Sequence, residues 1–127
     1  KILPPMLDAV EILQRKNPQI QFVLPVAPTR KRKDLEKIIA ESKVVSGKLT
    51  IVENETREAV ASADAAVVAS GTATLETGLL QTPMVVVYKV AAHNWHTLRH
   101  LINVPHYGLI NLIAEERLAA ELIQNDC

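Results

Sequence analysis

The chain has 127 residues, enough for one domain with a hydrophobic core, and 48% of them are apolar, which argues against a disordered segment. Its formal net charge is +0, so a general nucleic-acid binder, which depends on Lys and Arg contacts to phosphates, is not expected. The single cysteine excludes an internal disulfide framework, and no apolar run approaches the roughly 20 residues that cross a bilayer.

The first half of the chain alternates helical and extended patterns. Apolar residues at helical spacing predict a first helix of about four turns, which Asn17-Pro18 ends. Those apolar residues are Leu3, Met6, Leu7, Val10 and Leu13. The elements predicted next are a strand over Ile20–Leu24, a loop marked by Pro25 and Pro28, a helix over Lys31–Ser42, a strand over Leu49–Val52 and a helix over Glu55–Ser62.

The second half opens with a strand–turn–helix–strand pattern. Two short apolar runs, Ala65–Ala69 and Met84–Tyr88, flank a helical segment over Ala73–Leu80, as in a βαβ unit. The elements predicted after it are a helix over Asn94–Ile102, a loop over Pro105–Asn111 and a last helix over Ala114–Gln124. This alternation predicts an α/β fold with a doubly wound, mostly parallel sheet and helices on both faces.

The start of the chain predicts a missing piece. The sequence begins at Lys1, without Met, inside a predicted helix, whereas a doubly wound domain begins with a strand. We therefore expect residues 1–127 to form a single Rossmann-like domain that lacks its first strand in this sequence and belongs to a longer protein.

The turn Ser70-Gly71-Thr72 is the main candidate site. It follows a buried strand and opens a helix, where unpaired N–H groups and the helix dipole favour an anion such as a diphosphate. Gly71 allows close backbone approach, and Ser70 or Thr72 can cap the helix. Glu76 lies one turn further on, where its carboxylate could accept hydrogen bonds from ribose hydroxyls. A capped helix with no ligand is the alternative interpretation.

Other motifs carry less information. The basic run Arg30–Lys33 fits a solvated surface better than a phosphate or lipid-head site. Ser70 lacks the flanking glycines of a hydrolase elbow, so a nucleophilic role is not predicted. His93, His96 and His100 share one side of a helix, but no further ligand completes a zinc set nearby, so no metal is expected.

The helix over Asn94–Ile102 has two interpretations. Trp95, Leu98 and Ile102 form an apolar stripe that would pack in the core. The same stripe could instead dip into a membrane surface, with cationic groups at the headgroups.

Two longer segments resemble the bacterial lipid-A-disaccharide synthase family. They are Ala63–Glu76, read as ADAAVVASGTATLE, and Thr82–Val90, read as TPMVVVYKV. Asn103-Val104-Pro105, Asn111–Ala114 and Glu121–Gln124 follow the family's order, so the resemblance covers essentially the whole chain. The family has Pro where this chain has Ile110, and a Gly-Ser-Arg loop that would precede Lys1.

The resemblance implies an inverting glycosyltransferase with two Rossmann-like domains, of which this chain would be the C-terminal, donor-binding one. The implied reaction joins UDP-2,3-diacylglucosamine to 2,3-diacylglucosamine 1-phosphate, with release of UDP. Ser70, Gly71, Thr72 and Ala73 would hold the diphosphate, Glu76 the ribose, and Asn111 would be a further donor-site residue in its loop.

The same resemblance implies the partners and the location. They are the UDP-sugar donor, a lipid acceptor, the N-terminal domain and the surface of the inner membrane on its cytoplasmic side, with no cofactor. The catalytic groups would lie in the other domain, so this chain alone would be inactive. Another UDP-sugar transferase or epimerase of this architecture, and a non-catalytic Rossmann-like interaction domain, are the alternatives.

Overall fold

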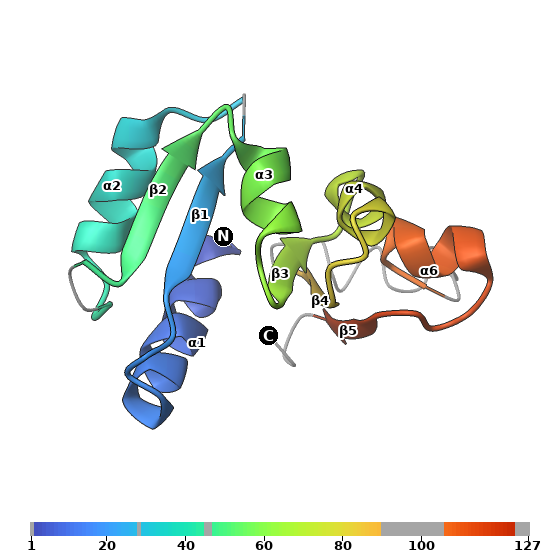
Figure 1. The fold of residues 1–127 in the computed structure, drawn as a ribbon, viewed down its shortest axis with the longest axis horizontal. Helices are drawn as coiled ribbons and strands as arrows, with labels where there is room; N and C mark the ends of the chain where they lie inside the picture. The colour runs from blue at the N-terminus through green and yellow to red at the C-terminus, as the bar shows by residue number, and fades with distance from the viewer. Residues whose placement is uncertain (1, 28, 45–46, 90–105, 124–127) are drawn as a thin grey trace. The chain divides into compact units, whose positions relative to one another are not determined.

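The computed structural model describes residues 2–27, 29–44, 47–89 and 106–123 (Figure 1). They form two compact units, one over Leu3–Ser62 and one that begins at Ala63. We call them the N-terminal and C-terminal units and describe each by itself. The helix predicted over Asn94–Ile102 and the three histidines of that segment lie outside the described residues.

The N-terminal unit holds a two-stranded parallel sheet with three helices. Its elements in chain order are α1 (Leu3–Lys16), β1 (Phe22–Val26), α2 (Arg32–Ala40), β2 (Leu49–Glu53) and α3 (Thr56–Ala61). β1 and β2 pair in register from Phe22↔Leu49 to Val26↔Glu53, and α3 packs against both strands. α1 carries basic residues in its last turn, where they complement the helix dipole.

The C-terminal unit holds a three-stranded parallel sheet in the order β3-β4-β5. Its elements are β3 (Ala66–Ala69), α4 (Ala73–Leu79), β4 (Met84–Tyr88), α6 (Leu109–Ala114) and β5 (Ala120–Ile123). Val86 and Val87 are 1% and 5% exposed, although successive strand residues point to opposite faces. Both faces of the sheet are therefore covered at β4, as its continuous apolar run predicted.

The fold class was predicted correctly. Strands alternate with helices in both units, and every strand pair described is parallel. The strand–turn–helix–strand pattern around Gly71 forms as expected, with α4 between β3 and β4 and packed against both.

The prediction of a last helix over Ala114–Gln124 was wrong. α6 ends at Ala114, Glu115 adopts a left-handed backbone with φ +55°, and Ala120–Ile123 is a strand that pairs with β4. The segment contains good helix formers, but the open edge of β4 offers a full set of backbone partners, and this pairing overrides local propensity.

Other element boundaries differ from the prediction by one or two residues, and α6 begins where a loop was predicted. β1 extends through Pro25, which was expected in the following loop, because the fixed φ of proline suits an extended chain and Val26 beyond it is buried. Asn111, expected in a loop, lies in α6.

Candidate functional site

The turn at the carboxyl end of β3 begins on the last rung of the sheet. The Ser70 N–H donates to the Val87 carbonyl at 2.9 Å, which extends the pairing one residue beyond β3. Gly71 then adopts φ +147°, a conformation that only glycine takes readily, and apart from its two chain neighbours no described residue has a heavy atom within 4 Å of where its Cβ would be. The chain therefore reverses into α4 with open space beside the glycine.

The backbone N–H groups of this turn are available to a ligand. Within the described part of the chain, the N–H groups of Gly71, Thr72 and Ala73 have no hydrogen-bond partner, and Thr72 and Ala73 are exposed. The predicted side-chain cap is absent, because Thr72 sits at the N-cap with no cap hydrogen bond and Ser70 bonds elsewhere. Unpaired donors at a helix start suit an anionic group.

Glu76 lies in the first turn of α4 with an exposed side chain. Its side chain is therefore not buried in the protein core. It lies one helical turn from Thr72, close to the open N–H groups along the chain.

The turn is supported from behind by the segment that leads into α6. The Ser70 hydroxyl donates to the Tyr107 carbonyl. Thr74, which is 0% exposed, donates its hydroxyl to the Gly71 carbonyl at 2.8 Å and accepts the Ile110 N–H at 3.4 Å. Two separate hydrogen bonds thus join the turn to residues 107–110.

Glu121 on β5 holds that segment in turn. Its carboxylate accepts the Gly108 N–H at 2.8 Å, the Tyr107 N–H at 3.1 Å and the Asn111 Nδ2–H at 2.8 Å. Partial burial acts to raise the pKa of Glu121, but hydrogen bonds from Gly108, Tyr107 and Asn111, with the nearby His106, outweigh it and leave the pKa lowered. The group is therefore held as a carboxylate.

Asn111 is 0% exposed, and its amide is fully engaged. Oδ1 accepts the Ala119 N–H at 2.8 Å, while Nδ2 donates to the Ala119 carbonyl and to Glu121, each at 2.8 Å. The side chain thus ties α6 to the start of β5. Its predicted contact with the UDP-sugar stays a prediction, because all the hydrogen bonds described for its amide go to Ala119 and Glu121.

The structure brings Ser70, Gly71, Thr72, Ala73 and Glu76 together at one edge of the sheet, with Asn111 behind them. Sequence reasoning missed Glu121, Thr74 and Tyr107. Glu121 fell in a segment predicted as helix, and no local pattern indicates that a carboxylate there caps a segment more than ten residues earlier.

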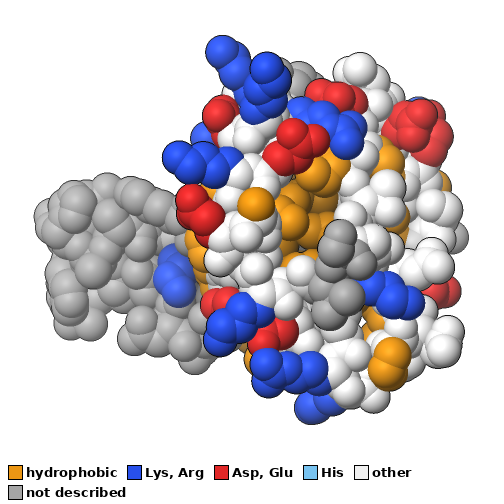
Figure 2. Space-filling view, turned by 90° about the vertical axis from the view of Figure 1, so that its left-hand side faces the viewer, with side chains coloured by type: hydrophobic (Ala, Val, Ile, Leu, Met, Phe, Trp, Pro, Cys, Tyr) orange, Lys and Arg blue, Asp and Glu red, His pale blue; other side chains and the backbone are white. Residues whose placement is uncertain are grey.

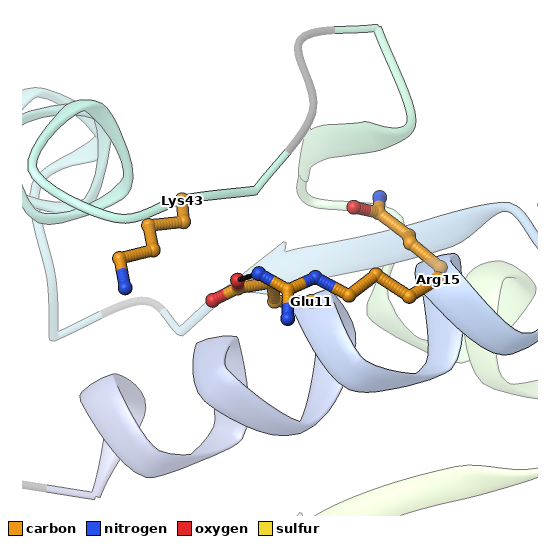
Figure 3. Close-up of a pocket in the computed structure, with 4 residues that line it drawn as sticks. Glu11, Arg15 and Lys43 are labelled. Carbon is orange, nitrogen blue, oxygen red and sulfur yellow. Dashed lines mark hydrogen bonds and ion pairs between the residues drawn. The ribbon is translucent and has the colours of Figure 1, made fainter.

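Two shallow depressions lie elsewhere on the units. One, of about 230 Å³, belongs to the N-terminal unit and is lined by Glu11, Gln14, Arg15 and Lys43, with Glu11 and Arg15 forming an ion pair (Figure 3). The other, of about 240 Å³, lies between α4 and α6 and has no charged residue in its lining. Its lining includes Met84, the first residue of β4. The depression therefore lies at the amino ends of the parallel strands, whereas the turn lies at their carboxyl ends.

The basic run Arg30–Lys33 is exposed, as expected of a solvated surface. Arg32 bonds Glu36 at 2.7 Å and approaches Glu53 at 3.6 Å. Figure 2 shows Lys and Arg side chains interspersed with Asp and Glu on the face that it presents. This run is therefore partly neutralised and does not form an isolated cationic site.

In residues 2–27, 29–44, 47–89 and 106–123, no three His, Cys, Asp or Glu side chains gather as a metal site would require. Nor does any helix in that part of the chain have the length and apolar character needed to cross a bilayer.

The chain matches one known family over its whole length. The family model described as Lipid-A-disaccharide synthetase matches residues 1–127. The chain belongs to the lipid-A-disaccharide synthetase family.

Named relatives in this family agree along almost the whole chain. A lipid-A-disaccharide synthase of Syntrophus aciditrophicus is 46% identical over 124 residues, or 98% of this chain and 32% of that protein. One from Anaeromyxobacter dehalogenans strain 2CP-C is 44% identical over 126 residues, or 99% of this chain and 32% of that protein. One from Pseudomonas putida is 38% identical over 120 residues, covering 94% and 31%. The chain thus spans about a third of the length of the curated relatives it matches.

Proposed function

We propose that this chain is the donor-binding half of a lipid-A-disaccharide synthase. In the proposed reaction the enzyme transfers diacylglucosamine from UDP-2,3-diacylglucosamine to 2,3-diacylglucosamine 1-phosphate, forms a β-1,6 bond with inversion and releases UDP. The observation that carries the proposal is the family match over residues 1–127. The open turn after β3 supports it with a place for the diphosphate.

The proposed diphosphate ligands are the backbone N–H groups of Gly71, Thr72 and Ala73, which have no partner among the described residues. Ser70 belongs to the same site but acts differently, because its N–H bonds Val87 and its hydroxyl bonds Tyr107. It would shape the turn. Donors fixed before the reaction would stabilise the negative charge that develops on UDP as the sugar bond breaks.

Glu76 is the proposed ribose ligand. A carboxylate beside a phosphate repels it, but two carboxylate oxygens can accept hydrogen bonds from two neighbouring hydroxyl groups. Its exposed position in the first turn of α4 leaves both oxygens accessible. Asn111 belongs to the proposed site through Glu121, because its buried amide bonds the carboxylate that also accepts the N–H groups of Tyr107 and Gly108.

In this proposal, the rest of the enzyme lies outside this chain. A second, N-terminal Rossmann-like domain would bring the acceptor and the catalytic groups, and a first strand preceding α1 would complete this domain. Because donor and acceptor carry acyl chains, we propose that the full protein works at the cytoplasmic surface of the inner membrane. The match to about a third of each relative's length is consistent with such a division.

The test is calorimetric titration of the intact protein with UDP and with uridine. Glu76→Ala should weaken both by about tenfold, since each ligand carries the ribose whose hydrogen bonds to a charged group are lost. Glu116→Ala, which removes another exposed carboxylate of the C-terminal unit, is the control and should bind as wild type.

Two results would contradict the proposal at different levels. Unchanged affinity in Glu76→Ala would remove the ribose role alone. Failure of the wild-type protein to bind UDP, or equal transfer of sugars with and without acyl chains, would remove the lipid A donor function itself.

A further inference from the structure

The hydrogen bonds behind the turn form one connected path from β5 to the proposed site. The Glu121 carboxylate binds the N–H groups of Tyr107 and Gly108, and the Tyr107 carbonyl accepts the Ser70 hydroxyl. The path from Glu121 to the N–H groups of Gly71–Ala73 thus passes through Tyr107 and Ser70. Glu121 itself bonds none of those N–H groups. Its connection to the turn runs through the 107–108 peptides.

We propose that Glu121 is a positioning residue for the donor site, which holds the Ser70–Ala73 turn in the shape that grips a diphosphate. This inference rests on the proposed function. Thr74 supplies a second support, because its buried hydroxyl joins the Gly71 carbonyl to the Ile110 N–H. The two supports converge on the same turn from the same segment.

The chemistry of the carboxylate explains why this position needs an ionised group. Three N–H donors converge on Glu121, and a carboxylate has acceptor sites for all of them. Gly108 and Asn111 both donate to Oε1, whereas the Tyr107 N–H is shared between Oε1 at 3.2 Å and Oε2 at 3.1 Å. A glutamine that keeps Oε1 would put its NH₂ donors in place of Oε2, against the Tyr107 N–H. Two donors would then face each other, and the Tyr107 peptide, whose carbonyl bonds Ser70, would shift.

The surroundings of Glu121 keep it ionised. Among the described residues, the groups that act on it are the backbone N–H groups of Tyr107 and Gly108, the Asn111 amide and the imidazole of His106, with no second carboxylate. A stable negative charge at this point gives short, charge-assisted hydrogen bonds to the segment behind the turn.

The test separates the diphosphate from the nucleoside. UDP and uridine are titrated by calorimetry into the intact wild-type protein and into Glu121→Gln. If Glu121 positions the turn, UDP should bind about tenfold more weakly to the variant, the scale of one lost hydrogen bond to a charged group, with uridine unchanged. Glu116→Gln, an exposed change in the α6–β5 connection, is the matched control and should leave both affinities unchanged.

A second pair of variants covers the case in which Glu121→Gln does not fold. Thr74→Val removes the hydroxyl but keeps the volume, and Thr74→Ser keeps the hydroxyl. Thr74→Val should show the same selective loss for UDP, and Thr74→Ser should bind as wild type.

The outcomes are distinct. Selective loss for UDP in Glu121→Gln and Thr74→Val supports the positioning role. Unchanged UDP affinity in the folded variants, or equal losses for UDP and uridine, overturns it and leaves the proposed function standing. Absence of UDP binding by the wild-type protein overturns the proposed function and this inference together.

Discussion

At the scale of single residues, the C-terminal unit is organised by polar side chains that bond to distant backbone. Asn111 and Thr74 are both 0% exposed, and each bridges two segments through hydrogen bonds. Burying such groups is favourable only when their partners are present, so each one specifies a single arrangement of its neighbours.

Glu121 makes this arrangement sensitive to pH. Its pKa is lowered in the folded protein, so the folded state binds the proton less tightly than the unfolded state, where the ordinary value is 4.5. Its contribution to the free energy of unfolding is therefore fully present above the unfolded pKa and is lost as the pH falls through the folded pKa.

We expect the free energy of unfolding to decrease more steeply between about pH 5 and pH 3 in the wild-type protein than in Glu121→Gln. Urea denaturation across this range measures the slopes, and Glu116→Gln should keep the wild-type slope. Parallel curves for the wild-type protein and Glu121→Gln would show that the pKa of Glu121 is the same in the folded and unfolded states, which would contradict the prediction.

At the scale of elements, the packing of α4 on α6 depends on a glycine. A Cβ at Gly78 would lie 2.6 Å from Ile110 Cδ1, 3.4 Å from its Cγ1 and 3.7 Å from Met84 Cε. Only the first distance is a clash, and it involves the end of a side chain. A side chain at position 78 therefore requires the Ile110 Cδ1 methyl to move aside, or a shorter side chain at position 110.

This packing gives a reciprocal prediction. Gly78→Ala in the wild-type background should leave stability nearly unchanged or lower it by up to about 1 kcal/mol, because the displacement of the Ile110 Cδ1 methyl opposes the helix preference of Ala over Gly. In an Ile110→Val background, which lacks Cδ1, the same change should instead stabilise by up to about 1 kcal/mol, the helix preference of Ala over Gly. Chemical denaturation of the four proteins gives the coupling energy. Equal effects of Gly78→Ala in both backgrounds would contradict the proposed clash.

The elements also show what the sequence could predict. The runs Ala65–Ala69 and Met84–Tyr88 were recognised as strands because continuous apolar runs are typical of buried parallel strands. The two-sided burial holds for β4, whereas Val67 on β3 is 51% exposed. The turn at Gly71 was recognised because glycine between a strand and a helix allows the backbone to reverse direction there. β5 was missed because four residues give little periodicity, and its pairing with β4 is long-range.

The candidate site divides in the same way. The residues proposed to bind the ligand, Gly71–Ala73 and Glu76, lie close together in the sequence and were predicted from the local pattern. The residues that support the turn, Thr74 and Glu121, lie far apart in the sequence, and the fold joins both to the 107–110 segment. Asn111 was predicted as part of the site, but its position in α6 and its burial were not.

At the scale of the whole molecule, the chain contains the proposed donor site and not the proposed acceptor site or catalytic groups. Its relatives are about three times as long, and the proposed donor site is the only functional site we assign to the described residues. The acceptor and the group that activates it would come from the rest of the protein.

We therefore expect the 127-residue chain alone to form no disaccharide from the UDP-sugar and the acylated sugar phosphate. The intact protein, assayed by chromatography of the lipid product, is the positive control. Product formation by the isolated chain at a comparable rate would place the catalytic groups within it.

The hydrogen bond from the Ser70 N–H to Val87 has a kinetic consequence. The binding loop begins on the final rung of a sheet ladder and is anchored from behind, so its conformation exists before any ligand arrives. Little ordering entropy remains to be lost on association. A nucleotide reaching this edge should dock in a single fast step, and its residence time, rather than a slow rearrangement of the loop, would set the affinity.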